Sequence, residues 1–231
     1  MTSQQLTRRQ FVTLGGTLCT YVLAGCATEQ ENTQETEGEA SEERPTNAQE
    51  GPQGELSTQE SNLLVLFFSR TGENYNVGVI EEGNTAIIAK MIASKTGADS
   101  FELVPDEPYP ESYQECCDVA LDEKNRNARP ALKALPDLSG CTTVFFGFPV
   151  WWGDLPMPVY TAIEALDWQG KIIAPFNTHE GSGDAGMFDT LARVCSGASV
   201  TGGLTIRGSV AQNDRVETEA EVDAWLAQLG F

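Results

Sequence analysis

Three mainly apolar runs, each about as long as a β-strand, constrain the fold of this chain more than any other feature. They span residues 63–68 (Leu-Leu-Val-Leu-Phe-Phe), 142–148 and 171–176. Runs of this kind are typical of strands that are buried on both faces of a parallel sheet. Weaker strand patterns at 100–104 and 199–206 bring the expected number of strands to five.

Helical patterns lie between these runs. Residues 85–95 place Ile87, Ile88, Met91 and Ile92 on one face of a helix. Further helices are expected at 111–124, 157–166, 186–194 and 217–229. Strands that alternate with helices in this way predict a single α/β domain over 61–231. We expect a doubly wound, five-stranded parallel sheet with helices on both faces.

The first 26 residues have the features of an export signal. Arg8 and Arg9 precede Phe11 and a short, mild apolar run, and this start resembles a twin-arginine signal. The run ends in Leu-Ala-Gly-Cys26, which resembles the bacterial lipobox and implies cleavage before Cys26 and lipidation of its thiol. The run is too short to span a bilayer. An ordinary secretory signal and a cysteine placed there by chance are the alternatives.

Residues 27–60 are rich in Glu, Gln, Thr, Ser and Gly and carry few apolar side chains. Such a segment cannot bury enough surface to offset the entropy lost on ordering, so we expect a disordered acidic tether. The protein would then be lipid-anchored on the extracytoplasmic side of the cell membrane. The whole chain has a net charge of −20, which argues against a nucleic-acid partner because such partners require a basic surface.

The loops that follow the three apolar runs are the candidate ligand site, because doubly wound sheets bind ligands beyond the carboxyl ends of their strands. The first loop begins Ser69-Arg70-Thr71-Gly72 and reaches the next helix at Asn84-Thr85. Hydroxyl groups and glycine before a helix N-terminus suit an anion such as phosphate. The lysine-containing loop of nucleotide triphosphatases is absent from the sequence.

The second and third loops carry aromatic and titratable side chains. The second loop contains Trp151 and Trp152, which are adjacent and cannot both point into one core. Aromatic faces of this kind are suited to stacking on a planar ligand. The third loop contains His179, the single histidine of the chain, in a glycine-rich turn. A histidine at this position could contact a ligand or handle a proton, although a structural role is the simpler alternative.

Together these loops resemble those of the flavodoxin family. The segment Phe-Ser-Arg-Thr-Gly resembles the flavodoxin phosphate loop, and the tryptophan loop resembles the one that packs against the isoalloxazine ring. The resemblance covers about 62–231 and implies a strand order of 2-1-3-4-5 and FMN as the cofactor.

The chain departs from the family pattern in the first loop. The family usually runs directly from Thr-Gly into Asn-Thr, whereas residues 73–83 intervene here. We expect an insertion that loops out while both of its ends close on the phosphate. This leaves the roles of Glu73 and Asn74 open. Glu81 and Glu82 are expected to face solvent, because they would repel a phosphate.

The resemblance assigns cofactor binding to three groups of residues, and no catalytic residue or metal ligand is assigned. Which of the two tryptophans contacts the flavin is left open. The expected FMN-binding residues are Ser69, Arg70, Thr71, Gly72, Asn84, Thr85, Pro149, Val150, Trp151, Trp152, Gly153, Thr178, His179, Glu180, Gly181 and Gly183.

The cysteines show no spacing typical of a zinc site or a disulfide framework. Cys116 and Cys117 could form a vicinal disulfide or a redox relay, but neighbours on a helix point apart, so two free thiols are expected. Cys141 and Cys195 are expected to be buried, with a disulfide between them as the alternative.

Three functions are compatible with these features. The first is an FMN-binding electron-transfer protein that works with a redox partner protein. The second is an FMN-dependent oxidoreductase that reduces a quinone or another small acceptor, although no signature of a nicotinamide site is present. The third is a flavin-free binding module with the same fold.

Overall fold

The computed structural model describes residues 62–231. The expected export signal, the lipidation site Cys26 and the acidic segment 27–60 lie outside the described residues. In the part that is described, no helix combines the length and the apolar character that crossing a membrane requires.

A parallel sheet forms the centre of the domain. Its strands run in the order β4-β1-β5-β6-β7, and β8 also pairs with β6. When β7 and β8 are counted as one interrupted strand, this is the predicted order 2-1-3-4-5. The strands are β1 (Leu63–Phe67), β4 (Asp99–Glu102), β5 (Thr143–Pro149), β6 (Ile172–His179), β7 (Ser199–Val200) and β8 (Leu204–Arg207).

The fifth strand is interrupted because residues between its two halves make contacts outside the sheet. The Gly202 carbonyl accepts a hydrogen bond from the Trp225 indole at 3.0 Å. A Cβ on Gly203 would lie 2.3 Å from the Phe188 ring, so this glycine packs directly on an aromatic side chain. The single strand predicted over 199–206 is therefore corrected to two short ones.

Alternate residues of the central strands build two separate cores. Leu64, Leu66 and Phe146 belong to one cluster, and Val65 and Phe145 belong to the other. This alternation explains why the central runs are apolar throughout, since both of their faces are covered.

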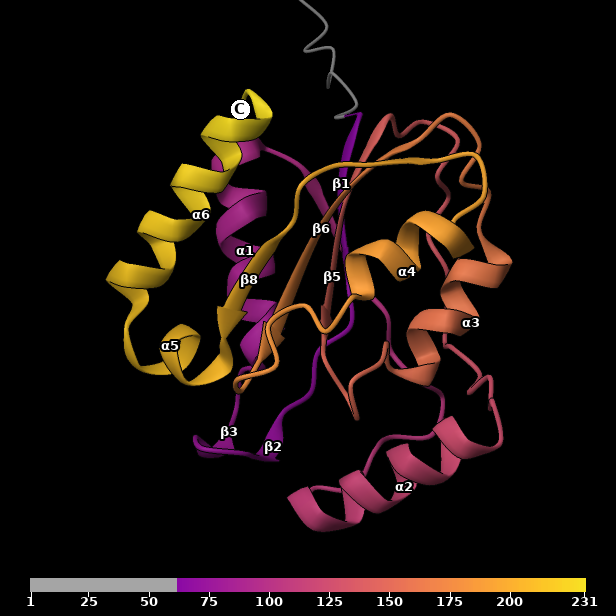
Figure 1. Ribbon diagram of the computed structural model, residues 1–231, viewed down its shortest axis with the longest axis vertical. Coiled ribbons are helices and arrows are strands. Elements are labelled where there is room, and N and C mark those ends of the chain that lie inside the picture. Colours follow the sequence, from indigo (N-terminus) through magenta and orange to yellow (C-terminus); the bar gives the residue numbers. More distant parts are fainter. Residues whose placement is uncertain (1–61) are drawn as a thin grey trace, which may run out of the picture. The chain divides into compact units, whose positions relative to one another are not determined.

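Helices cover both faces of the sheet, as predicted (Figure 1). α1, α5 and α6 pack over one face, and α3 and α4 pack over the other. The short helix α5 was not predicted. These helices are α1 (Asn84–Thr96), α3 (Met157–Ala165), α4 (Met187–Val194), α5 (Gly208–Asn213) and α6 (Arg215–Leu229).

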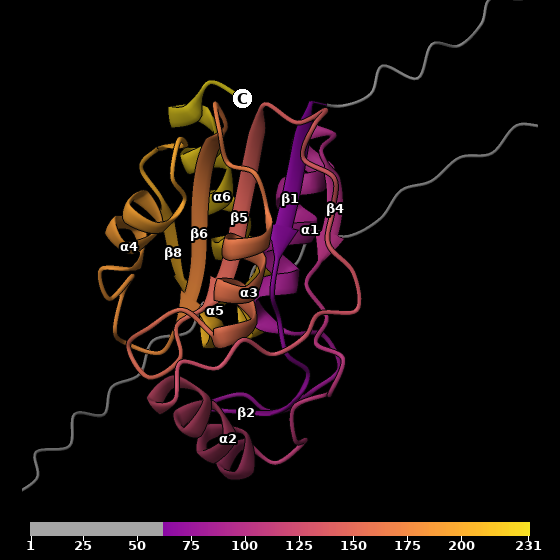
Figure 2. The same cartoon turned by 90° about the vertical axis from the view of Figure 1, so that its right-hand side faces the viewer.

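The remaining elements lie beyond the carboxyl ends of the strands instead of on a sheet face (Figure 2). Helix α2 (Tyr113–Asn125) crosses this end of the domain. The insertion after Gly72 forms an antiparallel hairpin of β2 (Gly72–Asn74) and β3 (Gly78–Ile80) beside it. The insertion that is expected to loop out therefore takes the form of a hairpin.

We expect the substitution Gly147→Ala to destabilise the domain. A Cβ at Gly147 would lie 2.1 Å from Cζ of Phe176, which is fully buried on the neighbouring strand. Overpacking of this kind lowers the free energy of unfolding by about 1–3 kcal/mol. Urea denaturation measures this change.

Gly140→Ala is the matched control, because a Cβ at Gly140 meets no atom within 4 Å. It should change the free energy of unfolding by less than about 0.5 kcal/mol. Equal stability of the two variants would contradict the packing of Phe176 on Gly147.

Candidate cofactor-binding site

A cavity of about 380 Å³ opens where the three predicted loops meet α2 and the hairpin. Its volume is within the usual range for small-molecule sites. Nine of the predicted residues line it: Arg70, Asn84, Pro149, Val150, Trp151, Trp152, Thr178, His179 and Glu180. The other seven predicted residues lie outside the lining: Ser69, Thr71, Gly72, Thr85, Gly153, Gly181 and Gly183.

The two ends of the insertion lie side by side at the start of α1. Ser69 Oγ accepts a hydrogen bond from the Ala86 amide at 3.1 Å, so it caps a helix whose own N-cap residue, Gly83, has no side chain. A Cβ on Gly83 would lie 2.2 Å from Ser69 Oγ. Only glycine permits this close approach, which keeps the first loop continuous in space although the hairpin divides it in sequence.

Arg70 fastens the hairpin to the start of α2. Its guanidinium donates to the carbonyls of Glu73 and Glu111, at 2.5 and 2.8 Å, and to those of Pro110 and Ser112. Glu73 completes this clamp, since its carboxylate accepts a hydrogen bond from the first amide of α2, at Tyr113. The open question about Glu73 is therefore answered by a structural role, and Asn74 next to it lines the cavity.

The acids at the end of the insertion point away from the cavity. Glu81 is exposed, as expected. Glu82 is only partly exposed, because it forms ion pairs with Lys90 at 2.6 Å and Arg215 at 3.1 Å. Glu82 does not line the cavity, and its two ion pairs lower the pKa of its carboxyl.

Asn84 presents an unpaired acceptor at the cavity. In the described part of the chain, its buried Oδ1 accepts no hydrogen bond, and Asn177 Oδ1 is the other buried atom of this kind. A buried acceptor without a partner costs about 1–3 kcal/mol. The nearby hydroxyls of Thr85 and Thr178 already share a hydrogen bond of 2.8 Å. A ligand that brings its own hydroxyl donor would satisfy Asn84.

The two tryptophans diverge, as their adjacency predicts. The Trp151 ring packs edge-on against Phe68 and Tyr109, with centroid distances of 5.3 and 5.0 Å. Trp152 is 51% exposed, and its indole Nε1 donates to the Cys117 carbonyl at 3.0 Å. Both line the cavity.

Trp152 occupies a strained backbone conformation. Trp152 and Gly153 have φ angles of 54° and 65°, in a two-residue turn closed by two hydrogen bonds between the backbones of Trp151 and Asp154. For a bulky side chain this left-handed conformation costs about 1–3 kcal/mol, and such strain is concentrated at functional sites. Lys124 helps to maintain the turn by donating to the Trp152 carbonyl at 2.7 Å.

His179 is held as a neutral ring. Its Nδ1 accepts hydrogen bonds from the amides of Gly181 and Gly183, at 2.8 and 3.2 Å, so the ring proton resides on Nε2. Burial lowers the pKa of His179, and the positive charge of Arg207 lowers it further. Gly181 and Gly183 therefore act behind the cavity, where they orient the imidazole.

Glu180 joins three segments at the cavity edge. Its carboxylate accepts hydrogen bonds from the Ser209 amide at 2.6 Å, from the Ser209 hydroxyl at 3.1 Å and from Asn76 Nδ2 at 3.1 Å. The hairpin tip, the third loop and the start of α5 are thereby connected.

The sequence analysis missed one whole wall of the cavity, which the hairpin and α2 provide. Tyr75 and Tyr113 are the most prominent members, with ring centroids 5.8 Å apart and exposures of 54% and 37%. The available signal was the polar character of 113–125, which is unusual for a helix that covers a sheet. The missed lining residues are Asn74, Tyr75, Tyr113, Gln114, Cys116, Cys117 and Ala120.

The four cysteines within 62–231 are free thiols, so neither a vicinal disulfide nor a Cys141–Cys195 bridge is present. Burial raises the pKa of Cys116 to about 11 and that of Cys195 to about 12. Both thiols therefore stay protonated at neutral pH and are poor nucleophiles. The same part of the chain contains no cluster of three or more side chains that could hold a metal ion.

The pKa of His179 in the folded protein is expected to lie below the ordinary value of 6.5. Because the neutral ring is favoured on folding, its contribution to stability is present above about pH 6.5 and is lost as the pH falls through the folded-state pKa. His179 is the only histidine of the chain, so a proton NMR titration measures the value directly. A midpoint at or above 6.5 would contradict the described environment, and His179→Gln should remove this part of the pH dependence of stability.

Comparison with known proteins agrees with this geometry. The sequence profile of the flavodoxin family matches residues 77–227, which is more than half of the chain. The match includes α1 and the second and third loops and begins after β1 and Ser69. None of the curated proteins matches the sequence.

Several solved structures share the fold. A proposed flavoprotein from Bacteroides uniformis is 26% identical, with a TM-score of 0.56 over 71% of this chain and 97% of that one. One from Bacteroides eggerthii is 24% identical, with a TM-score of 0.55 over 73% and 98%. A flavoprotein from Lactobacillus acidophilus, solved in complex with FMN, is 22% identical, with a TM-score of 0.52 over 71% and 97%. From the extent of the profile match, we conclude that this chain belongs to the flavodoxin family.

Proposed function

We propose that this chain binds FMN in the cavity and serves as a redox protein that transfers electrons. Family membership supports FMN as the cofactor, and a structural neighbour of the same fold is an FMN complex. The observation that carries the proposal is the meeting of three separate loops in one cavity, at the sheet end where doubly wound domains bind ligands.

The residues at the cavity fit the three parts of FMN. The first turn of α1, capped through Ser69, offers backbone amides to a phosphate. Asn84 Oδ1 lacks a donor, which a ribityl hydroxyl would supply. Trp151, Trp152 and Tyr113 provide aromatic surface for the ring system.

The chain itself would tune the bound cofactor. FMN supplies the capacity to accept and release electrons. The described domain carries 24 acidic and 11 basic side chains, a net charge of −13, and this charge disfavours an additional negative charge on reduced flavin. The aromatic wall acts in the same direction by excluding water. Both effects lower the reduction potential. His179 offers a neutral Nε2–H donor at the cavity, which can hydrogen bond to the cofactor.

A second candidate function is an FMN-dependent oxidoreductase that reduces a quinone or another small acceptor. The observation in its favour is the exposed aromatic rim of Tyr75, Tyr113 and Trp152, which could stack on a planar substrate. Turnover of purified protein with NAD(P)H and a quinone would favour this function over partner-to-partner electron transfer.

The sequence of the first 26 residues also supports a location. We infer that the domain is exported and held on the extracytoplasmic side of the membrane by a lipid at Cys26. Several acyl chains would be needed for stable anchoring, because a single chain binds only marginally.

FMN binding predicts that freshly purified protein is yellow, with an absorbance band at about 450 nm that belongs to the flavin. Colourless protein that does not take up added FMN would instead indicate a flavin-free binding module.

Asn84→Asp tests whether the FMN phosphate binds at the start of α1, because a carboxylate at this position would repel a phosphate. Its FMN affinity should fall by about tenfold or more, while its affinity for riboflavin, which has no phosphate, should be nearly unchanged.

Asn62→Asp is the matched control. It adds the same charge before β1, at the opposite end of the sheet. It should bind FMN as the unmodified protein does. An equal loss of FMN affinity in both variants, or an equal loss of riboflavin affinity in Asn84→Asp, would contradict the assigned phosphate position.

The anchor is tested by Cys26→Ala in the full-length chain. This variant should not incorporate labelled fatty acid and should shift from the membrane fraction to the soluble fraction. Cys19→Ala, which changes another cysteine of the same segment, should behave as the unmodified protein does. Lipid incorporation in Cys26→Ala would contradict the proposed anchor.

A further inference from the structure

A group of polar side chains behind the cavity wall converges on the strained turn of Trp152. The turn ends at Asp154, and Asp154 Oδ1 accepts hydrogen bonds from the Tyr160 hydroxyl and the Leu155 amide, both at 2.8 Å. Its Oδ2 lies 3.5 Å from Lys124 Nζ, and Lys124 also donates to the Trp152 carbonyl. Asp154 is therefore bonded to α3 through Tyr160 and to α2 through Lys124.

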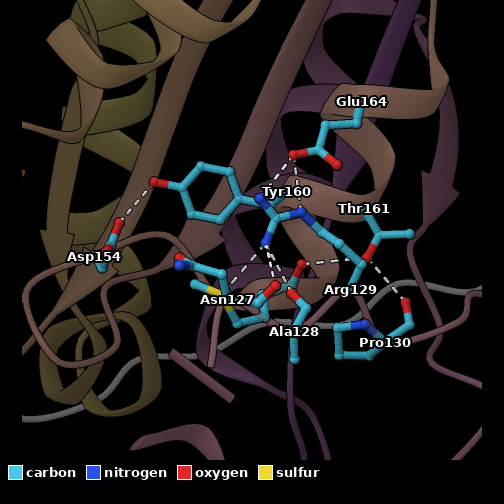
Figure 3. Close-up of polar contacts among 9 residues, drawn as sticks. Asn127, Ala128, Arg129, Pro130, Asp154, Tyr160, Thr161 and Glu164 are labelled. Atoms are coloured by element: carbon cyan, nitrogen blue, oxygen red, sulfur yellow. Dashed lines mark hydrogen bonds and ion pairs between the residues drawn. The ribbon is translucent and has the colours of Figure 1, made fainter. Parts of the chain in front are cut away.

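Tyr160 is in turn held by Arg129 (Figure 3). The guanidinium carbon of Arg129 lies 5.1 Å from the centre of the Tyr160 ring. Its Nε and Nη2 donate to Glu164 Oε1 at 2.8 and 2.7 Å, and its Nη1 donates to the carbonyls of Asn127 and Ala128. Arg129 thus joins the segment after α2 to α3 and fixes the ring that carries the hydroxyl.

None of Arg129, Tyr160 and Asp154 lines the described cavity. Their contacts end at Asp154, the last residue of a turn whose first two residues, Trp151 and Trp152, do line it. The turn needs such support, because Trp152 has a φ of 54° and half of its side chain stays exposed. Because Trp152 is not buried in a core, its position depends strongly on the hydrogen bonds made by its turn and its indole nitrogen.

We propose that Arg129, Tyr160 and Asp154 are positioning residues that fix the indole of Trp152 at the cavity. The hydrogen bond from Tyr160 of α3 to Asp154 fixes the conformation of the turn, and the turn fixes the backbone of Trp152. The indole of Trp152 then donates a hydrogen bond to the Cys117 carbonyl of α2. The expected effect of these residues on cofactor affinity rests on the proposed binding of FMN. Their expected effect on the position of the indole does not depend on FMN.

Tyr160→Phe tests this arrangement, because it removes one hydroxyl and keeps the ring beneath Arg129. The Trp152 indole N–H, one of four tryptophan signals and assigned by its loss in Trp152→Asn, should exchange faster with solvent. The affinity for FMN should fall by about fivefold, the effect expected for one lost hydrogen bond. Glu164→Gln removes the negative charge that pairs with Arg129 and leaves the turn unchanged. It should also speed up the exchange of the indole N–H and lower the affinity for FMN.

Thr161→Val is the matched control. It removes the hydroxyl that donates to the Pro130 carbonyl at 2.9 Å and to the Met157 carbonyl of the same helix at 3.3 Å, and neither contact leads to Asp154. It should lower the stability comparably but leave the indole exchange and the FMN affinity unchanged. If Tyr160→Phe behaves like Thr161→Val, the network is only structural and the proposal is wrong.

A double-mutant cycle identifies the route of the effect. Asparagine tolerates left-handed backbone, so Trp152→Asn removes the indole while keeping the turn. In this background Tyr160→Phe should cause no further loss of FMN affinity, and additive losses would overturn the proposal. If the unmodified protein fails to bind FMN, the proposed function fails, while indole exchange in the cofactor-free protein still tests the positioning role.

Discussion

Burial of the central strands on both faces is the constraint on which the rest of the structure depends. Because side chains of β1, β5 and β6 are enclosed by helices on either side, polar chemistry is confined to the strand ends. At the carboxyl ends the chain places a capped helix start at Ser69, the strained turn of Trp152 and the oriented ring of His179. Hydrophobic burial thus determines where the site is, and the loops determine what it can bind.

The site is completed by elements that do not belong to the layered core. Helix α2 and the hairpin are fastened by polar contacts, chiefly from Arg70 to backbone carbonyls and from Lys124 and Trp152 across the cavity. Such contacts contribute less stabilisation than core packing. The wall formed by Tyr75 and Tyr113 therefore depends on polar contacts more than the layered core does, and cofactor binding against it would stabilise it.

Sequence predicted the parts of the fold that follow from local pattern. The run at 63–68 contains β1 (Leu63–Phe67), as a short continuous apolar segment is typical of a strand covered on both faces. The three loops after the buried strands meet as expected. The polar character of 113–125 indicates only that α2 is unlike a helix that covers a sheet. Its actual location depends on contacts such as the Arg70 clamp, which joins residues about forty positions apart. The broken fifth strand depends on Trp225 and Phe188 reaching Gly202 and Gly203, and periodicity does not report such contacts.

The contact between Ser69 and Gly83 has a consequence for how the family can vary in length. The two ends of the first loop, at Ser69 and Gly83, are fixed to each other in space, so the segment between them begins and ends at the same place in the fold. For a flexible excursion, doubling the number of residues adds only about 0.6 kcal/mol of closure entropy. Relatives can therefore lengthen or shorten this segment, and exchange the surface it presents, without changing the contact at the start of α1. The contact of Asn76 with Glu180 at its tip is one of the connections that such changes would remove.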